Sequence, residues 1–416
     1  MNVKETSVSP RLVGLQQNLE AGNTKALEYF WKEIKEQGTP LIEEVEGDDQ
    51  HRLVTFLWQA SGELLSVALV SLMTKPTTYD MTHLPDTDLW YVTLRLPSDL
   101  RATYQFFPEG RSASAQDANV SPWAAYRPDP FNPNVFAFYT EDEDPTEVKL
   151  TRSVLELPYA SSQPWIKVQE GVAKGKVHLH QLSSNILGNE RSVWVYSPAK
   201  YTGGLGKPCP LLVLFDGWAY AYLIPTFTIL DNLIAAGEIP PTIAVLPDSL
   251  DTEVRLKELV FHQPFNDFLV TELLPWVLAR YAVTSDPRQT VIGGSSAGGL
   301  AAAYAALEHP EVFGNVLSQS GAFTINPSWD TEGRWLARQY EQREKLPLKF
   351  HLDTGTLEVN SYRELRDGVT PLAGNQHMRD TLRSKGYEVH YTEFSGGHDY
   401  VSWQGTLADG LIALLG

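Results

Sequence analysis

Cysteine and basic residues are scarce in this chain. Cys209 is the single cysteine among 416 residues, and one thiol cannot form an internal disulfide. The 33 Lys and Arg face 51 Asp and Glu, so the formal net charge is −18. Because general binding to nucleic acid or to an anionic membrane needs a basic surface, this balance argues against both as partners.

Long apolar runs are also missing. No stretch approaches the roughly 20 apolar residues that a membrane-spanning helix needs. The first ten residues, from Met1 to Pro10, are polar and lack the apolar core of a secretory signal. The expected compartment is therefore the cytoplasm, whose reducing conditions also suit a single free thiol.

The first part of the chain predicts a small all-β domain. A composition of 43% hydrophobic and 20% charged residues is that of a globular protein, and the length suits two or three domains. Apolar residues at helical spacing predict one helix, from Thr24 to about Gln37. Short strand-like runs separated by turns follow, so we expect a β-sandwich within residues 1–150. The expected strands are Leu53–Gln59, Leu65–Leu72, Leu89–Leu96 and Ala102–Phe107.

Residues 110–164 are rich in turn-forming residues and weak in periodicity, which predicts a long loop with an interdomain linker at 151–170. Residues 171–416 then alternate between strands and helices. This alternation predicts a mostly parallel sheet covered by helices on both faces. The expected strands are Val177–Leu182, Arg191–Tyr196, Leu211–Phe215, Ile243–Leu246, Thr290–Gly293, Phe313–Ser318, Lys349–Leu352 and Val389–Phe394. The expected helices are Ala221–Ala236, Phe265–Tyr281, Ala297–His309, Thr331–Gln342, Gly374–Gly386 and Tyr400–Leu415.

The segment Gly294-Ser295-Ser296-Ala297-Gly298 fits the pattern G-x-S-x-G between the fifth of these strands and a helix. In a nucleophile elbow the serine occupies a strained turn that exposes its hydroxyl, and the glycines allow close backbone contact. Ser296 is therefore the candidate nucleophile. The backbone N–H of Ala297, at the start of the helix, is a candidate donor to an oxyanion. Eight strands with this turn after the fifth are typical of an α/β-hydrolase.

A serine nucleophile needs a base and an orienting acid, which follow it in the order acid, then His, in this fold. His398 lies on a glycine-rich loop after the last strand and before the final helix, which makes it the candidate base. His377 and His390 instead fall in a predicted helix and strand. The acid stays open between two carboxylates: we favour Glu358, on a loop past the strand end, over Asp353, which is close to the strand itself.

The second oxyanion donor is expected after the third strand of this domain. The candidates are the backbone N–H groups of Gly217 and Trp218, which follow Leu211–Phe215. Asp216 precedes Ser296, against the expected order for a triad acid, so we interpret it as a brace for this turn.

Several segments resemble the enterochelin (ferric enterobactin) esterases, and they fall in that family's order along most of the chain. In the first part they are Phe30–Glu43 with its Gly-Thr-Pro turn, Val54–Trp58, Asp86–Tyr91 and Asp129–Pro133. In the second part they are Leu214–Gly217, Arg255–Leu259, Gly294–Gly299 and Gly396–Asp399. The hydrolase motifs alone are also similar to esterase D and feruloyl esterases. The segments of the first part are therefore the ones that indicate a siderophore esterase within this wider group.

The resemblance implies a serine esterase that cleaves the trilactone backbone of catecholate siderophores through an acyl-enzyme on Ser296. It implies no cofactor and no metal site, because iron enters with the substrate. Arg255 is the candidate for binding the anionic ferric complex, with a salt bridge to Glu253 or Glu258 as the alternative. Trp218 is a candidate for stacking on catechol rings, as is Trp123, for which we favour ordinary packing as the alternative. The alternative functions are a feruloyl or acyl-carbohydrate esterase and a catalytically weak siderophore-binding protein.

Overall fold

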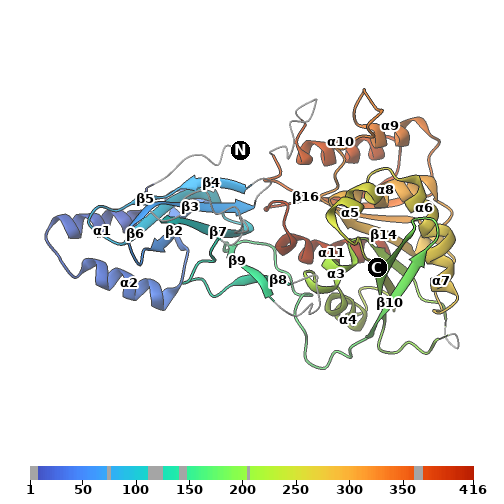
Figure 1. Cartoon of the computed structure of the whole chain (residues 1–416), viewed down its shortest axis with the longest axis horizontal. Helices are drawn as coiled ribbons and strands as arrows, with labels where there is room; N and C mark the ends of the chain where they lie inside the picture. The colour runs from blue at the N-terminus through green and yellow to red at the C-terminus, as the bar shows by residue number, and fades with distance from the viewer. Residues whose placement is uncertain (1–7, 73–75, 111–124, 140–147, 204–206, 360–368) are drawn as a thin grey trace. The chain divides into compact units, whose positions relative to one another are not determined.

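A computed structural model describes residues 8–72, 76–110, 125–139, 148–203, 207–359 and 369–416 (Figure 1). The chain forms two compact units. The first comprises Met1–Ser161 together with Ser395–Val401, and the second comprises Ser162–Phe394 together with Ser402–Gly416. Each unit is described separately.

The first unit contains two antiparallel sheets, which confirms the expected β-sandwich. One sheet has the order β1-β2-β6-β5 and the other the order β4-β3-β7-β9-β8. The strands of the first are β1 (Leu41–Val45), β2 (Asp48–Gln59), β5 (Thr82–His83) and β6 (Leu89–Pro97). Those of the second are β3 (Leu64–Leu72), β4 (Pro76–Asp80), β7 (Arg101–Gly110), β8 (Val135–Tyr139) and β9 (Val148–Glu156).

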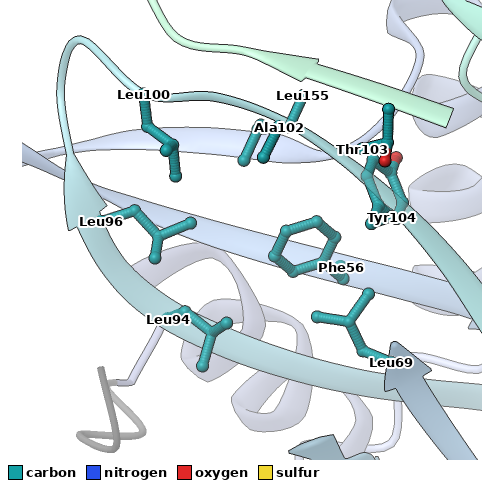
Figure 2. A pocket seen from close by; sticks show the side chains of 9 residues that line it. All are labelled: Phe56, Leu69, Leu94, Leu96, Leu100, Ala102, Thr103, Tyr104 and Leu155. Atoms are coloured by element: carbon teal, nitrogen blue, oxygen red, sulfur yellow. The ribbon is translucent and has the colours of Figure 1, made fainter. Parts of the chain in front are cut away.

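Apolar side chains from both sheets meet in the interior of the sandwich. Figure 2 shows a small pocket there, lined by Phe56 and Leu94 from one sheet and by Leu69 and Tyr104 from the other. The rings of Phe56 and Tyr104 pack edge to face with their centroids 4.8 Å apart. Thr103, the neighbour of Tyr104 in β7, is also among the residues that line this pocket.

Two helices, α1 (Pro10–Glu20) and α2 (Ala26–Gln37), pack their apolar residues into a second cluster of this unit. Trp31 of α2 lies in this cluster and donates its indole N–H to Asp88 Oδ1 over 2.8 Å. The helix expected from Thr24 begins at Ala26, and α1 was not expected. Ser9 caps α1 by accepting the N–H of Leu12, and Pro10 stands at the first helical position.

The expectation of a long loop over 110–164 is wrong where β8 and β9 form. β9 pairs with β7 and runs through the expected start of the linker at residue 151, and the compact unit extends to Ser161. β8 pairs with β9, so both strands complete the second sheet. Tertiary pairing, rather than a strong local pattern, stabilises these two strands.

The second unit is built on an eight-stranded sheet of order β10-β11-β13-β12-β14-β15-β16-β17. The strands are β10 (Lys176–Ser184), β11 (Asn189–Ser197), β12 (Leu211–Leu214), β13 (Ile243–Pro247), β14 (Thr290–Ser295), β15 (Asn315–Gln319), β16 (Lys349–Gly355) and β17 (Glu388–Phe394). β10 and β11 form an antiparallel hairpin and β11 pairs antiparallel with β13, whereas the remaining pairings are parallel. The expected mostly parallel sheet is confirmed.

Helices cover both faces of this sheet. The α-helices are α3 (Gly217–Tyr222), α4 (Thr226–Ala236), α5 (Thr252–Leu259), α6 (Gln263–Phe268), α7 (Leu274–Leu278), α8 (Ala297–Glu308), α9 (Trp335–Gln342), α10 (Pro371–Ser384) and α11 (Tyr400–Leu415). A Cβ on Gly299 of α8 would lie 2.4 Å from Ser318 Oγ, and one on Gly410 of α11 would lie 2.8 Å from Leu317 Cδ1. Because successive side chains of β15 point to opposite faces, α8 and α11 lie on opposite sides of the sheet.

Two expected helices are interrupted. The helix expected over Ala221–Ala236 is divided into α3 and α4, with Pro225 between them. The helix expected over Phe265–Tyr281 contains a π-turn at Leu269–Leu273 between α6 and α7, just before Pro275. Proline lacks the N–H that an α-helix uses at that position, so a break near each proline has a direct physical cause.

Candidate active site

Ser296 lies in a strained turn between β14 and α8. Its φ of 58° and ψ of −118° are unusual for a residue with a side chain. A Cβ on Gly294 would lie 2.9 Å from the backbone of Gly298, so the turn can close only with glycine there. Local crowding therefore explains the G-x-S-x-G spacing.

Three backbone hydrogen bonds fix Ser296. Its N–H donates to Gln319 O over 2.8 Å, and its carbonyl accepts the N–H of Ala322 over 2.9 Å and that of Leu300 over 3.2 Å. Ser295 is buried, whereas Ser296 is partly exposed. Of the two serines in the motif, Ser296 is thus the one that a substrate can reach.

The loop after β12 lies beside this turn. β12 and β14 pair in parallel with Leu214 opposite Gly293, so the segments that follow them emerge at the same edge of the sheet. A Cβ on Gly298 would lie 3.4 Å from Asp216 Oδ2, which brings the first turn of α8 against that loop. The first N–H groups of a helix have no partner within the helix, and both α3 and α8 begin here. The two helix starts therefore direct N–H groups toward one region.

The two expected donors of this loop differ in their surroundings. A Cβ on Gly217 would lie 2.4 Å from Leu246 O, so this residue requires glycine. The N–H of Trp218 donates to Asp248 Oδ1 over a long 3.4 Å. Gly217 is therefore the better candidate for an oxyanion donor.

Asp216 and Arg255 form a bidentate ion pair. Arg255 Nε and Nη2 donate to Asp216 Oδ1 and Oδ2, each over 2.6 Å, and Ser249 Oγ donates to Oδ1 over 2.7 Å. The salt bridge that the structure shows for Arg255 is thus to Asp216, a partner that the sequence did not suggest, and Glu258 binds buried Arg191 at 2.7 Å. Arg255 thus braces the turn that carries Gly217.

Glu358 is fully buried and held by two donors. Its Oε1 accepts Ser320 Oγ–H over 2.5 Å and the N–H of Gly355 over 2.9 Å. Ser320 in turn accepts the indole N–H of Trp403 over 3.0 Å. Sequence reasoning missed Ser320 and Trp403. The positive φ of Ser320, 48°, has no sequence signature in a serine, so only the folded chain reveals this network.

Asp353 lies within β16 and is also fully buried. Neither carboxylate oxygen has a hydrogen-bond partner among the described residues, and His351 Nε2 is 3.7 Å from Oδ2. Burial raises the pKa of Asp353 above its usual value. The hydrogen bonds that fix the Glu358 side chain have no counterpart at Asp353 among the described residues, so the geometry favours Glu358 as the acid.

His398 lies on the segment after β17 and is partly exposed, in a stretch that belongs to the first compact unit. The next residue, Asp399, is buried and accepts hydrogen bonds from Thr103 of β7. His377 lies in α10 and His390 in β17, as expected. Trp123 lies outside the described residues.

Within the described ranges, no group of three or more His, Cys, Asp or Glu side chains is arranged to hold a metal ion. No helix of that part of the chain is both long enough and apolar enough to span a bilayer.

The sheet order, with a strained serine between the fifth strand and a helix, defines the chain as an α/β-hydrolase. Residues 184–414 match the family model described as a putative esterase, and residues 53–166 match the one described as the N-terminal part of enterochelin esterase.

Curated relatives match nearly the whole chain. An iron(III) enterobactin esterase of Dickeya dadantii is 30% identical, and the match covers 93% of each chain. An iron(III) salmochelin esterase of Escherichia coli is 28% identical, with 97% of this chain and 98% of that one covered. The crystal structure of the Shigella flexneri enterobactin esterase in the presence of enterobactin superposes with a TM-score of 0.73 at 28% identity, covering 93% and 97% of the two chains. A xylanase/feruloyl esterase is more distant, with 26% identity over 39% of this chain.

The chain belongs to the enterochelin esterase family. It is a carboxylic ester hydrolase with the two-part organisation of that family, in which a β-rich N-terminal part precedes the hydrolase.

Proposed function

We propose that this protein hydrolyses the trilactone backbone of catecholate siderophores such as ferric enterobactin, and thereby releases their iron. The observation that carries the proposal is the extent of the similarity. It covers the β-sandwich as well as the hydrolase part, whereas the match to a feruloyl esterase covers 39% of the chain. Opening the ring weakens the chelation of iron, because the three catecholates are then no longer held on one preorganised scaffold.

Ser296 is the proposed nucleophile and His398 the proposed general base. His398 takes the proton of the Ser296 hydroxyl, and the resulting alkoxide attacks a lactone carbonyl. The N–H groups of Gly217 and Ala297 stabilise the oxyanion. The ring alcohol leaves with a proton from His398, and a water that His398 activates then hydrolyses the acyl-enzyme. Repeated cycles release the linear trimer, the dimer and the monomer.

Glu358 is the proposed acid that orients His398 and stabilises its charged form. The hydrogen bonds from Ser320 and Gly355 support this role, because they hold the carboxylate in one position. Asp353 is buried with a raised pKa and serves less well.

Arg255 and Trp218 are the proposed substrate-binding residues. The side chain of Arg255 is 27% exposed, so an anionic ligand can approach it, although its charge is shared with Asp216. The Trp218 ring lies 5.8 Å from that of Tyr222 and offers an aromatic surface for a catechol.

The reaction needs no cofactor of the protein, because acyl transfer to serine requires only the groups named above and iron arrives with the substrate. The substrate is a small molecule, and the proposed compartment is the cytoplasm.

A substrate panel tests the proposed function. Ferric enterobactin, apo-enterobactin, a salmochelin, bacillibactin and a feruloyl sugar are each incubated with the protein and with Ser296→Ala, and the products are separated by chromatography. We expect linear trimer, dimer and monomer from at least one trilactone with the wild type only. Feruloyl release without trilactone cleavage would contradict the proposal. Binding without cleavage of any ester would identify a siderophore-binding protein instead.

A further inference from the structure

The segment that carries His398 is hydrogen-bonded to the first residues of β7. The N–H of Arg101 donates to Ser395 O over 3.0 Å. Thr103 lies two residues further along the strand. Its N–H and its hydroxyl both donate to Asp399 Oδ2, over 3.2 Å and 2.6 Å. The pairing of β7 with β3 ends at Tyr104, opposite Ser71. The segment that carries His398 therefore contacts residues of β7 that do not pair with β3.

The contact with Asp399 is buried and specific. Thr103 is 0% exposed and Asp399 is 3% exposed, although the two residues are 296 positions apart in the chain. The other carboxylate oxygen, Oδ1, accepts the N–H of Val401 at the start of α11, over 3.3 Å. A buried carboxylate costs much free energy unless it is hydrogen-bonded, so loss of the Thr103 hydroxyl directly affects the position of this segment.

A cation of β9 lies near the same carboxylate. The guanidinium of Arg152 stacks 4.3 Å from the centre of the Phe138 ring, and that ring contacts Tyr400 with centroids 6.2 Å apart. Burial lowers the pKa of Arg152, while the charges of Asp399 and Tyr400 oppose this change. The residues on both sides of His398 in sequence are thus in contact with β7 and β8.

We propose that the N-terminal β-sandwich positions the catalytic histidine, with Thr103 as a positioning residue that acts through Asp399. The sandwich then contributes to the rate of the chemical step for any ester, in addition to any contact with the siderophore. This inference rests on the proposed role of His398 as the base.

The test compares Thr103→Val with Thr103→Ser, using both ferric enterobactin and the small ester p-nitrophenyl acetate. Valine keeps the shape of threonine and the backbone N–H but removes the hydroxyl, whereas serine keeps the hydroxyl. Thr93→Val is a matched control, because Thr93 is also a buried threonine of the sandwich, 2% exposed, and its hydroxyl pairs with that of Thr55 over 2.9 Å.

We expect Thr103→Val to lower kcat about 10- to 100-fold on both substrates, the effect of a small misplacement of a catalytic group. KM should stay within about twofold, Thr103→Ser should restore most of kcat, and Thr93→Val should keep it. If Thr103→Val does not fold, Asp399→Asn replaces it with the same expected loss of kcat.

Two results would overturn the inference. One is an unchanged kcat on p-nitrophenyl acetate with a raised KM for the siderophore, which would limit the sandwich to substrate recognition. The other is an equal loss of activity and thermal stability in Thr103→Val and Thr93→Val, which would indicate a merely structural role. A protein that cleaves p-nitrophenyl acetate but no siderophore refutes the proposed substrate alone, since the Thr103 comparison can still be made on the small ester.

Discussion

Replacing Glu358 by Gln should remove the charge of the proposed acid and leave its position unchanged. Glu358 Oε1 accepts hydrogen bonds from Ser320 and Gly355, and a Gln side chain can present its carbonyl oxygen to the same two donors. What changes is the other end of the side chain, where an amide replaces a carboxylate oxygen. Under the proposed mechanism, the imidazolium that forms at His398 would then lose its counter-charge, and the neutral imidazole would lose the acceptor that fixes its tautomer.

The expected magnitude follows from other serine hydrolases in which the acid was removed. There kcat falls by about 10⁴- to 3 × 10⁴-fold, which corresponds to roughly 5.5 to 6 kcal/mol in the activation free energy. We expect the same range for Glu358→Gln on ferric enterobactin, with a change in KM of less than about threefold. Because the two hydrogen bonds persist, thermal stability should change by less than about 1 kcal/mol.

Asp353→Asn is the matched control for this experiment. It removes a buried carboxyl of the same sheet edge and should keep kcat within about threefold. Steady-state kinetics on ferric enterobactin, with thermal melts of both variants, makes the comparison. A large loss of kcat in Asp353→Asn with near-normal turnover in Glu358→Gln would refute the assignment of the acid, and full activity in both variants would indicate a Ser–His dyad.

Three further outcomes are expected. Gly217→Ala should lower kcat at least tenfold, because the added Cβ would lie 2.4 Å from Leu246 O and displace the loop. Kinetics on p-nitrophenyl acetate tests this expectation, and an unchanged rate would contradict it. Arg255→Met should lower both kcat and the melting temperature, because it leaves Asp216 without its bidentate partner. An effect limited to the KM of the ferric complex would contradict this and assign Arg255 to substrate binding only. Asp353→Asn should be more stable than the wild type at neutral pH, and the difference should diminish as the pH falls toward about 4, the ordinary pKa of an Asp side chain. Burial in the folded protein raises the pKa of this carboxyl, so its contribution to wild-type stability is lost as the pH rises above about 4. Thermal melts across pH check this, and parallel curves for the two proteins would contradict it.

The central strands of the hydrolase sheet were predictable because they are short apolar runs between turns. Leu211–Leu214 and Ile243–Pro247 are buried at every position, and such runs have no competing helical pattern. The turn at Ser296 was predictable because glycines at fixed positions are the signature of its crowding. β8 and β9 were missed because pairing stabilises them: β8 pairs with β9, and β9 pairs with β7, which lies well before it in the chain.

The partners of the charged side chains could not be read from the sequence. Arg255 has acidic neighbours within one helical turn, yet it pairs with Asp216, 39 residues away, because the fold brings α5 to the loop after β12. The contact of Thr103 with Asp399 spans 296 residues, and nothing in the alternation of β7 distinguishes Thr103 from any other strand threonine. Local patterns predict elements, whereas such contacts depend on the complete tertiary structure.

The acyl-enzyme on Ser296 is the central claim, and mass spectrometry of the protein quenched during turnover of enterobactin tests it most directly. We expect a dihydroxybenzoylserine-type adduct on the peptide that contains Ser296. We expect no adduct and almost no hydrolysis in Ser296→Ala, which should still bind the siderophore. Near-normal turnover by Ser296→Ala, or an adduct on another residue, would contradict the assignment of Ser296 as the nucleophile.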